Sequence, residues 1–225
     1  TQDIPISIQA LTAENLKAEQ IYDMTDLAEV VPGFGVAKGV GSGSAYSMRG
    51  IGSYGVGAAV VGSIVTSING HSTNTSVMND MGFIDLARIE VLKGPQGTLF
   101  GRNSVGGVVN LITKRPTSEV EGYLDVQLGN WNRENIVGAI NVPFSDTIKG
   151  RLAFSTNKMD GMVENGFNSP FALLNNQNTG EMMDDRNDAS GRLSLDWDIS
   201  DSTELKFTYF VQESDDNRPQ EEVTY

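Results

Sequence analysis

Residues 88–116 read RIEVLKGPQGTLFGRNSVGGVVNLITKRP, and this stretch decides how the rest of the chain is interpreted. Gly94-Pro95 and Gly97 allow a tight chain reversal, because glycine accepts positive φ and proline holds φ near the value that a turn needs. Gly101 follows Leu99-Phe100, a pair that we expect to be buried, and Gly106-Gly107 let two backbones approach closely. The apolar runs on either side, residues 88–92 and 108–112, are too short for long helices and predict strands.

The composition of the whole chain excludes several classes of function. The chain has 225 residues, no cysteine, a single histidine, His71, and a formal net charge of -13. The absence of cysteine excludes disulfides, thiolate metal sites and thiol nucleophiles, and one histidine gives little basis for a zinc site or a Ser-His-Asp triad. The acidic balance argues against nucleic acid as a partner, because phosphate binding needs clustered Lys and Arg. No apolar run approaches the ~20 residues of a membrane helix.

The chain divides near residues 116–119 into halves of different charge. Residues 1–116 hold eight basic and nine acidic side chains, whereas residues 117–225 hold eight basic and twenty acidic ones. Pro116 also ends a strand-like run and disfavours helix at the residue before it. We therefore expect two domains, residues 1–116 and residues 117–225.

Two short helices are expected early in the first domain. Thr12 precedes good helix formers at residues 13–18, and its hydroxyl can accept a hydrogen bond from a first-turn amide. Thr25 is expected to cap a second helix over residues 26–31, which Pro32-Gly33 ends. Glycines then recur every few residues, so short strands and tight turns should follow.

Apolar and polar residues alternate in five runs of the second half, at residues 120–128, 136–142, 148–155, 191–199 and 204–212. Each run predicts a strand with one apolar face, close to the ~9–11 residues that a tilted strand needs to cross a bilayer. The connections at 143–147 and 200–202 are short, whereas segment 158–187 is long, polar and acidic. Such turns and loops suit an outer-membrane barrel, but a soluble antiparallel sandwich shows the same alternation.

The order of residues in 88–116 separates these two alternatives. The stretch closely resembles the plug-domain signature of TonB-dependent outer-membrane receptors. Met48-Arg49-Gly50-Ile51 resembles the arginine-glycine motif of that plug, and residues 3–8 resemble its first strand. The residues that carry the signature are Arg88, Glu90, Lys93, Gly94, Pro95, Gly97, Gly101, Arg102, Asn103, Gly106, Gly107 and Asn110.

The resemblance implies a mixed plug domain of short helices and strands, followed by the first antiparallel strands of a transmembrane β-barrel. The closed barrel of this family has roughly 22 strands around a plugged lumen. Five strands cannot close a barrel, because an open sheet leaves unpaired edges in lipid. We therefore expect the chain to be part of a longer protein.

The resemblance also implies transport without catalysis, cofactor or metal centre. Members of the family take up scarce ligands through the outer membrane of Gram-negative bacteria, such as ferric siderophores, cobalamin, haem and oligosaccharides. TonB, an inner-membrane protein, supplies the energy from the periplasmic side. Two other functions stay open: a surface receptor that binds without transport, and a soluble β-rich enzyme, for which the sequence shows no catalytic constellation.

Two groups of site residues follow from the resemblance. Tyr54, Gly55 and the turn formed by His71, Ser72, Thr73, Asn74 and Thr75 match plug loops that face the incoming ligand. Arg49 matches an arginine that pairs with barrel carboxylates, and Lys93 stands at a second such position. Arginine can pair bidentately, whereas lysine brings a point charge. An exposed polar turn residue is the simpler interpretation of His71.

Overall fold

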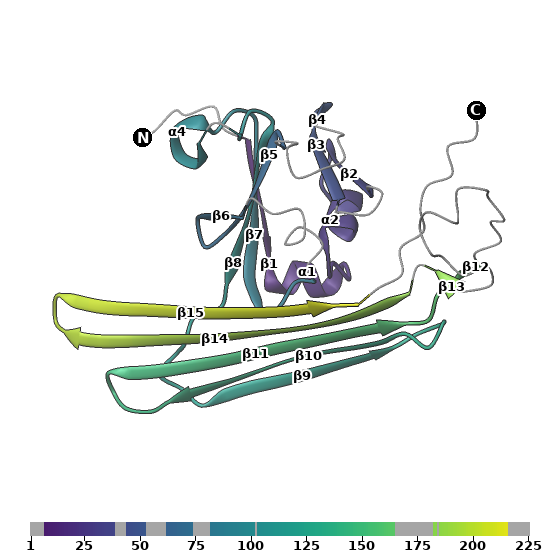
Figure 1. The fold of residues 1–225 in the computed structure, drawn as a ribbon. Coiled ribbons are helices and arrows are strands. Elements are labelled where there is room, and N and C mark those ends of the chain that lie inside the picture. Colours follow the sequence, from purple (N-terminus) through teal and green to yellow (C-terminus); the bar gives the residue numbers. More distant parts are fainter. Residues whose placement is uncertain are drawn as a thin grey trace, which may run out of the picture. The chain divides into compact units, whose positions relative to one another are not determined.

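The structure is a computed structural model, and it describes residues 7–38, 44–52, 62–73, 82–101, 103–164, 182–183 and 185–215. The chain forms two compact units, Thr1–Lys114 and Arg115–Tyr225, which are described separately (Figure 1). Their division lies beside the boundary that the sequence predicts at Pro116. Residues 3–6 of the expected first strand, and most of the acidic segment 158–187, lie outside the described residues.

The first unit contains two sheets. The larger one has the strand order β1 (Ser7–Thr12), β7 (Leu86–Lys93), β8 (Gly107–Thr113), β5 (Ile64–Ile68) and β6 (His71–Thr73). β5 and β8 are parallel, and the other pairs are antiparallel. The smaller sheet consists of β2 (Phe34–Lys38), β3 (Ser44–Met48) and β4 (Ile51–Gly52). The strands predicted on both sides of the glycine-rich turn are thus confirmed as the central pair β7 and β8.

Helix α1 (Ala13–Ala18) begins where the sequence predicts. The Thr12 hydroxyl accepts a hydrogen bond from the amide of Asn15, and the Asn15 side chain accepts one from the amide of Thr12. This reciprocal cap satisfies two amides at the helix terminus. A side-chain hydrogen bond from Thr12 also lowers the pKa of Glu14 in the first turn.

Helix α2 (Met24–Val30) begins earlier than predicted, because its cap is Asp23 rather than Thr25. Oδ1 of Asp23 accepts from the amides of Thr25 at 2.7 Å and of Asp26 at 2.9 Å. A carboxylate near the first amides of a helix also interacts favourably with the helix dipole. A further short helix, α4 (Gly97–Phe100), lies within the glycine-rich turn, where the sequence predicts only a reversal.

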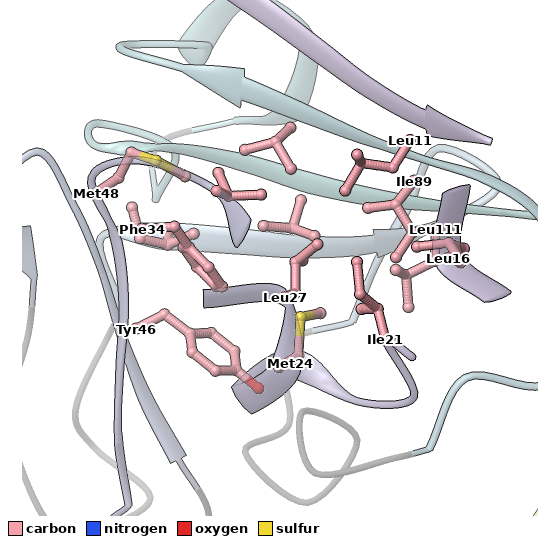
Figure 2. Packing of buried hydrophobic residues seen from close by; sticks show 14 of the residues in the cluster. Leu11, Leu16, Ile21, Met24, Leu27, Phe34, Tyr46, Met48, Ile89 and Leu111 are labelled. Atoms are coloured by element: carbon pink, nitrogen blue, oxygen red, sulfur yellow. The ribbon is translucent and has the colours of Figure 1, made fainter. Parts of the chain in front are cut away.

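The main hydrophobic core of the first unit is formed by the two helices, the larger sheet and strands β2 and β3 of the smaller sheet (Figure 2). Leu16 of α1 and Leu27 of α2 pack into the same cluster as Ile89 of β7 and Leu111 of β8. Leu27 and Ile89 are fully buried, and each such side chain contributes ~1.5–3 kcal/mol by leaving water. The core therefore holds the signature strands β7 and β8 rigidly in place.

The second unit is an antiparallel meander. Its strands lie in the order β15 (Thr203–Ser214), β14 (Arg186–Ser200), β11 (Ile148–Met159), β10 (Glu134–Pro143) and β9 (Glu121–Leu128). All five alternating runs are thus confirmed as strands. β11 and β14 reach further than the alternation predicts, because their ladder continues to the pair Met159 and Arg186. Between β11 and β14 in the chain, β12 (Val163–Glu164) and β13 (Met182–Met183) form a short antiparallel pair.

The apolar face of this sheet is exposed and its polar face is partly buried. Leu124, Leu152 and Phe207 are exposed, and no second sheet of this unit covers them among the described residues. On the opposite face, Asn141 and Arg151 are buried. A soluble sandwich would cover its apolar side, so this pattern favours the barrel alternative. Among the described residues, no helix is long and apolar enough to cross a membrane.

Candidate functional site

The signature residues gather on β7, on β8 and in the loop between these strands. β7 carries Arg88, Glu90 and Lys93, and β8 carries Asn110. Gly94, Pro95, Gly97, Gly101, Asn103 and Gly106 lie in the loop or in α4, Gly107 begins β8, and Arg102 lies outside the described residues. The signature is therefore one connected structural feature at the centre of the plug.

Asn110 is the centre of a buried polar network. Its Nδ2 donates to Oε2 of Glu90 at 3.0 Å, and its Oδ1 accepts from the Ser67 hydroxyl at 2.7 Å and from the Gly70 amide at 3.1 Å. The other carboxylate oxygen of Glu90 pairs with Nε of Arg88 at 2.7 Å. Because each polar group has a partner, the network ties β5, β7 and β8 together without an unsatisfied buried group at Asn110.

The glycine-rich loop is closed by hydrogen bonds between its two arms. The Gly94 amide donates to the Gly106 carbonyl at 3.0 Å, and the Gln96 amide donates to the Ser104 carbonyl at 2.9 Å. Gly107 has a φ of +155°, and a Cβ there would lie 2.5 Å from the carbonyl oxygen of Leu92. The expected close approach of two backbones is therefore confirmed at this residue.

The structure corrects one expectation in the loop and adds two residues to it. Leu99 is not buried but 73% exposed, and it lies in α4, of which no residue is buried. Gln96 and Ser104 are buried, and neither is among the residues predicted from the sequence. The Ser104 hydroxyl donates to the Gly101 carbonyl at 2.7 Å, so it fixes the end of α4. In the sequence, the serine between glycines was the feature that pointed to a turn hydrogen bond at Ser104.

Arg49 and Lys93 lie on different elements of the plug. Arg49 follows β3 with a φ of +52°, and its amide donates to the Gly33 carbonyl at 2.6 Å. The ammonium of Lys93 donates to Oε1 of Gln9 at 3.1 Å and to the Pro32 carbonyl at 3.0 Å. Within the described part of the chain, neither side chain forms an ion pair. Their pairing with barrel carboxylates stays a prediction.

The turn predicted at residues 71–75 is wrong for its first three residues, because His71–Thr73 form strand β6, directly after a two-residue turn; His71 and Ser72 are exposed. Asn69 and Gly70 form this turn with φ values of +52° and +83°, the left-handed pair that a tight hairpin needs. Oδ1 of Asn69 accepts from the Thr113 amide at 3.0 Å, so the turn is fixed to the end of β8. The Asn-Gly dipeptide was a readable signal for it. Tyr54, Gly55, Asn74 and Thr75 lie outside the described residues.

Thr73 ends the described part of this hairpin. It is half-buried, and its hydroxyl donates to the Thr66 carbonyl at 3.1 Å.

The described residues contain no group of three or more His, Asp or Glu side chains that could hold a metal ion. The hydrogen bonds around β7 and β8 hold these strands and the loop between them in position. Lys93 ends β7, whereas Arg49 follows β3.

Comparisons with known proteins agree with this geometry. Residues 1–108 match the family model described as TonB-dependent Receptor Plug Domain. The iron-regulated outer membrane virulence protein of Vibrio cholerae is 30% identical over 179 residues, which cover 74% of this chain and 27% of that protein. The ferric-pyoverdine BN7/BN8 receptor of Pseudomonas putida is 29% identical over 67% of this chain and 18% of the receptor.

Solved structures show the same fold. The ferric yersiniabactin uptake receptor FyuA from Yersinia pestis matches with a TM-score of 0.79 and 20% identity, over 92% of this chain and 31% of the receptor. The siderophore receptor PiuA from Acinetobacter baumannii matches with a TM-score of 0.73 and 20% identity, over 94% of this chain and 27% of the receptor.

The chain belongs to the TonB-dependent receptors of the Gram-negative outer membrane, with a plug domain followed by antiparallel strands of a plugged barrel. It spans about a quarter of the length of the curated relatives that it matches first. The Pseudomonas putida relative is a receptor by name, and the family points away from catalysis.

Proposed function

We propose that this chain is the plug and first barrel strands of a receptor that imports a ferric siderophore with energy supplied through TonB. The observation that carries the proposal is the joining of two features in one chain. One is the plug with its signature strands tied together at Asn110, and the other is a sheet whose apolar face is exposed. Two relatives, which match 67% of this chain at 29% and 28% identity, are named as receptors for ferric pyoverdine and ferric aerobactin.

The proposed mechanism needs no bond to be made or broken. The ligand binds from outside to the plug and the barrel wall, with Tyr54, Gly55 and residues 71–75 as the ligand-facing candidates. Arg49 and Lys93 hold the plug in the lumen through ion pairs with barrel carboxylates. An unpaired charge in the lumen is costly, so these pairs keep the plug seated until TonB pulls on it.

Uptake by cells that produce the full-length receptor tests this function. Radioactive iron would be loaded onto aerobactin, pyoverdine or enterobactin and added to cells that lack their own siderophore receptors. We expect accumulation of one ferric complex that stops when a protonophore dissipates the proton gradient, or when TonB is deleted.

Two other outcomes would exclude the proposal in different ways. Binding that persists without accumulation would mean a surface receptor that does not transport. The absence of both binding and accumulation for all three ferric complexes would remove the siderophore proposal, and haem, cobalamin and oligosaccharides would then be tested in the same assay.

A further inference from the structure

Residues 115–119, here called the connector, join the last plug strand to the first strand of the sheet. They belong to the same compact unit as the sheet. Asn141 of β10, which is fully buried, directs its whole side-chain amide at this segment. Its Oδ1 accepts from the Thr117 amide at 3.0 Å, and its Nδ2 donates to the carbonyls of Thr117 at 3.0 Å and Glu119 at 2.6 Å.

A second contact holds the start of the connector. The guanidinium of Arg115 pairs with the carboxylate of Asp196 on β14. Asn141 and Asp196 lie on strands that β11 separates, so the connector is held at two places on the polar face of the sheet. The contact of Arg115 with Asp196 is a charge-assisted hydrogen bond, and Asn141 binds both the amide and the carbonyl of Thr117. Together these contacts restrain a segment of only five residues strongly.

The Asn141 contacts differ from those of another asparagine in the same strand. Asn135 also lies in β10, on the same face, and is also buried. Its Nδ2 donates to Oε1 of Gln127 on β9 at 3.4 Å, so it links two strands of the sheet. Asn141 instead binds backbone groups outside the strands, in the segment that leads back to the plug.

We propose that Asn141 and Asp196 are positioning residues that anchor the connector to the barrel wall. This inference rests on the proposed function, in which TonB pulls on the plug. A force applied to the plug is transmitted along the backbone through Lys114 to the connector. Because Asn141 and Asp196 hold the connector, the force does not reach the first barrel strand. The plug can therefore be rearranged while this strand and its ladder to β10 stay in place.

Hydrogen exchange in the full-length receptor tests the anchor directly. The Thr117 amide donates to Asn141, so its exchange rate reports this contact. We expect Asn141→Leu to speed exchange at Thr117 by about tenfold or more, because a hydrogen bond is lost. Asp196→Asn, which keeps the size of the side chain, should speed it severalfold. Asn135→Leu and Asp198→Asn are the matched controls, because Asp198 pairs with Lys149 and not with the connector.

Transport separates an anchor from a merely structural contact. Cells with the Asn141→Leu or Asp196→Asn receptor should bind the ferric siderophore as the parent does, but accumulate it at least about threefold more slowly. The two controls should accumulate it normally. Unchanged exchange at Thr117, or fast exchange with normal accumulation in both variants, would overturn the inference. A parent receptor that accumulates no ferric siderophore would refute the proposed function, and exchange at Thr117 would still decide whether the connector is anchored.

Discussion

Asn110 shows how much one side chain determines in this plug. It accepts from Ser67 and Gly70 and donates to Glu90, and both Asn110 and Ser67 are buried. Replacement by leucine keeps the approximate size but leaves the buried Ser67 hydroxyl and one carboxylate oxygen without this partner. We expect Asn110→Leu to lower the free energy of unfolding of the plug by about 2–4 kcal/mol.

Hydrogen exchange of the peptides that cover β5 and β8 measures this loss. Ser72→Ala, at an exposed position in the neighbouring β6, should change protection by less than about 0.5 kcal/mol. Equal protection in the parent and Asn110→Leu would show that the network adds little to the stability of the plug.

Among the glycines that the structure describes, Gly107 is the one at which a Cβ would lie closest to a backbone atom of another strand. A Cβ would lie 2.5 Å from the Leu92 carbonyl oxygen, and the positive φ adds strain for any other residue. We expect Gly107→Ala to destabilise the pairing of β7 and β8 by about 2–3 kcal/mol, measured by exchange at residues 86–93.

Gly97 is the matched control for this substitution. It begins α4, and a Cβ there would meet no atom within 4 Å. Gly97→Ala should be neutral or stabilise by up to about 1 kcal/mol, because alanine has less freedom in the unfolded chain. Similar losses of stability in Gly97→Ala and Gly107→Ala would contradict the close approach of the backbones at Gly107.

At the scale of elements, the cap of α2 distinguishes two starting points for this helix. Asp23 accepts from the amides of Thr25 and Asp26, so Asp23→Ala should cost about 1 kcal/mol. Thr25→Ala should cost less than about 0.5 kcal/mol, because Thr25 lies within the helix and does not cap it. Thermal unfolding of the two purified receptors compares them, and a larger loss for Thr25→Ala would favour the later start.

The two faces of β15 make a second test at this scale. Phe207 lies on the apolar face and Thr208 on the polar one, and both are exposed. Arginine on the lipid side of a barrel costs about 2–4 kcal/mol near the bilayer midplane. We expect Phe207→Arg to reduce the amount of folded receptor in the outer membrane. The loss would be measured as a weaker heat-modifiable band on gels. Thr208→Arg should keep that band, and equal tolerance of both would argue against a lipid-facing Phe207.

The elements that the sequence predicts correctly are those that follow from local pattern. Alternation reveals all five strands of the meander, because one face is apolar throughout. The ends of β11 and β14 were not predictable, since a ladder between distant segments extends them past the point where alternation fades. The cap at Asp23 was missed because Thr25 is also a good capping residue, and packing of Met24 and Leu27 in the core sets the helix start.

The candidate site was predictable in part for a related reason. The signature residues are close in sequence, so their gathering on β7 and β8 follows from the reversal between them. The contacts of Asn110 with Ser67 and Gly70, and of Lys93 with Gln9, join residues far apart in the chain. No local pattern indicates such pairs, and they became visible only with the sheet order.

At the scale of the whole molecule, charge differs between the two units. Residues 117–225 carry twenty acidic side chains against eight basic ones, whereas residues 1–116 are nearly balanced. Arg49 is exposed on the plug, and the resemblance to the family predicts that it pairs with a carboxylate of the barrel. Such a pair would make the seating of the plug depend on charge.

Reversal of this charge is the prediction for the whole receptor. Arg49→Glu would place a carboxylate where a cation is expected, and like charges in a lumen of low dielectric repel. We expect uptake of the ferric siderophore to fall by about tenfold, with ligand binding changed less than about threefold. Lys17→Glu makes the same change of charge at an exposed position of α1. Uptake should then stay within about twofold of the parent, because ion pairs of solvent-exposed side chains contribute little to stability. If both variants transport equally well, Arg49 does not hold the plug through its charge. If both fail equally, the net charge of the plug matters, and not the position of Arg49.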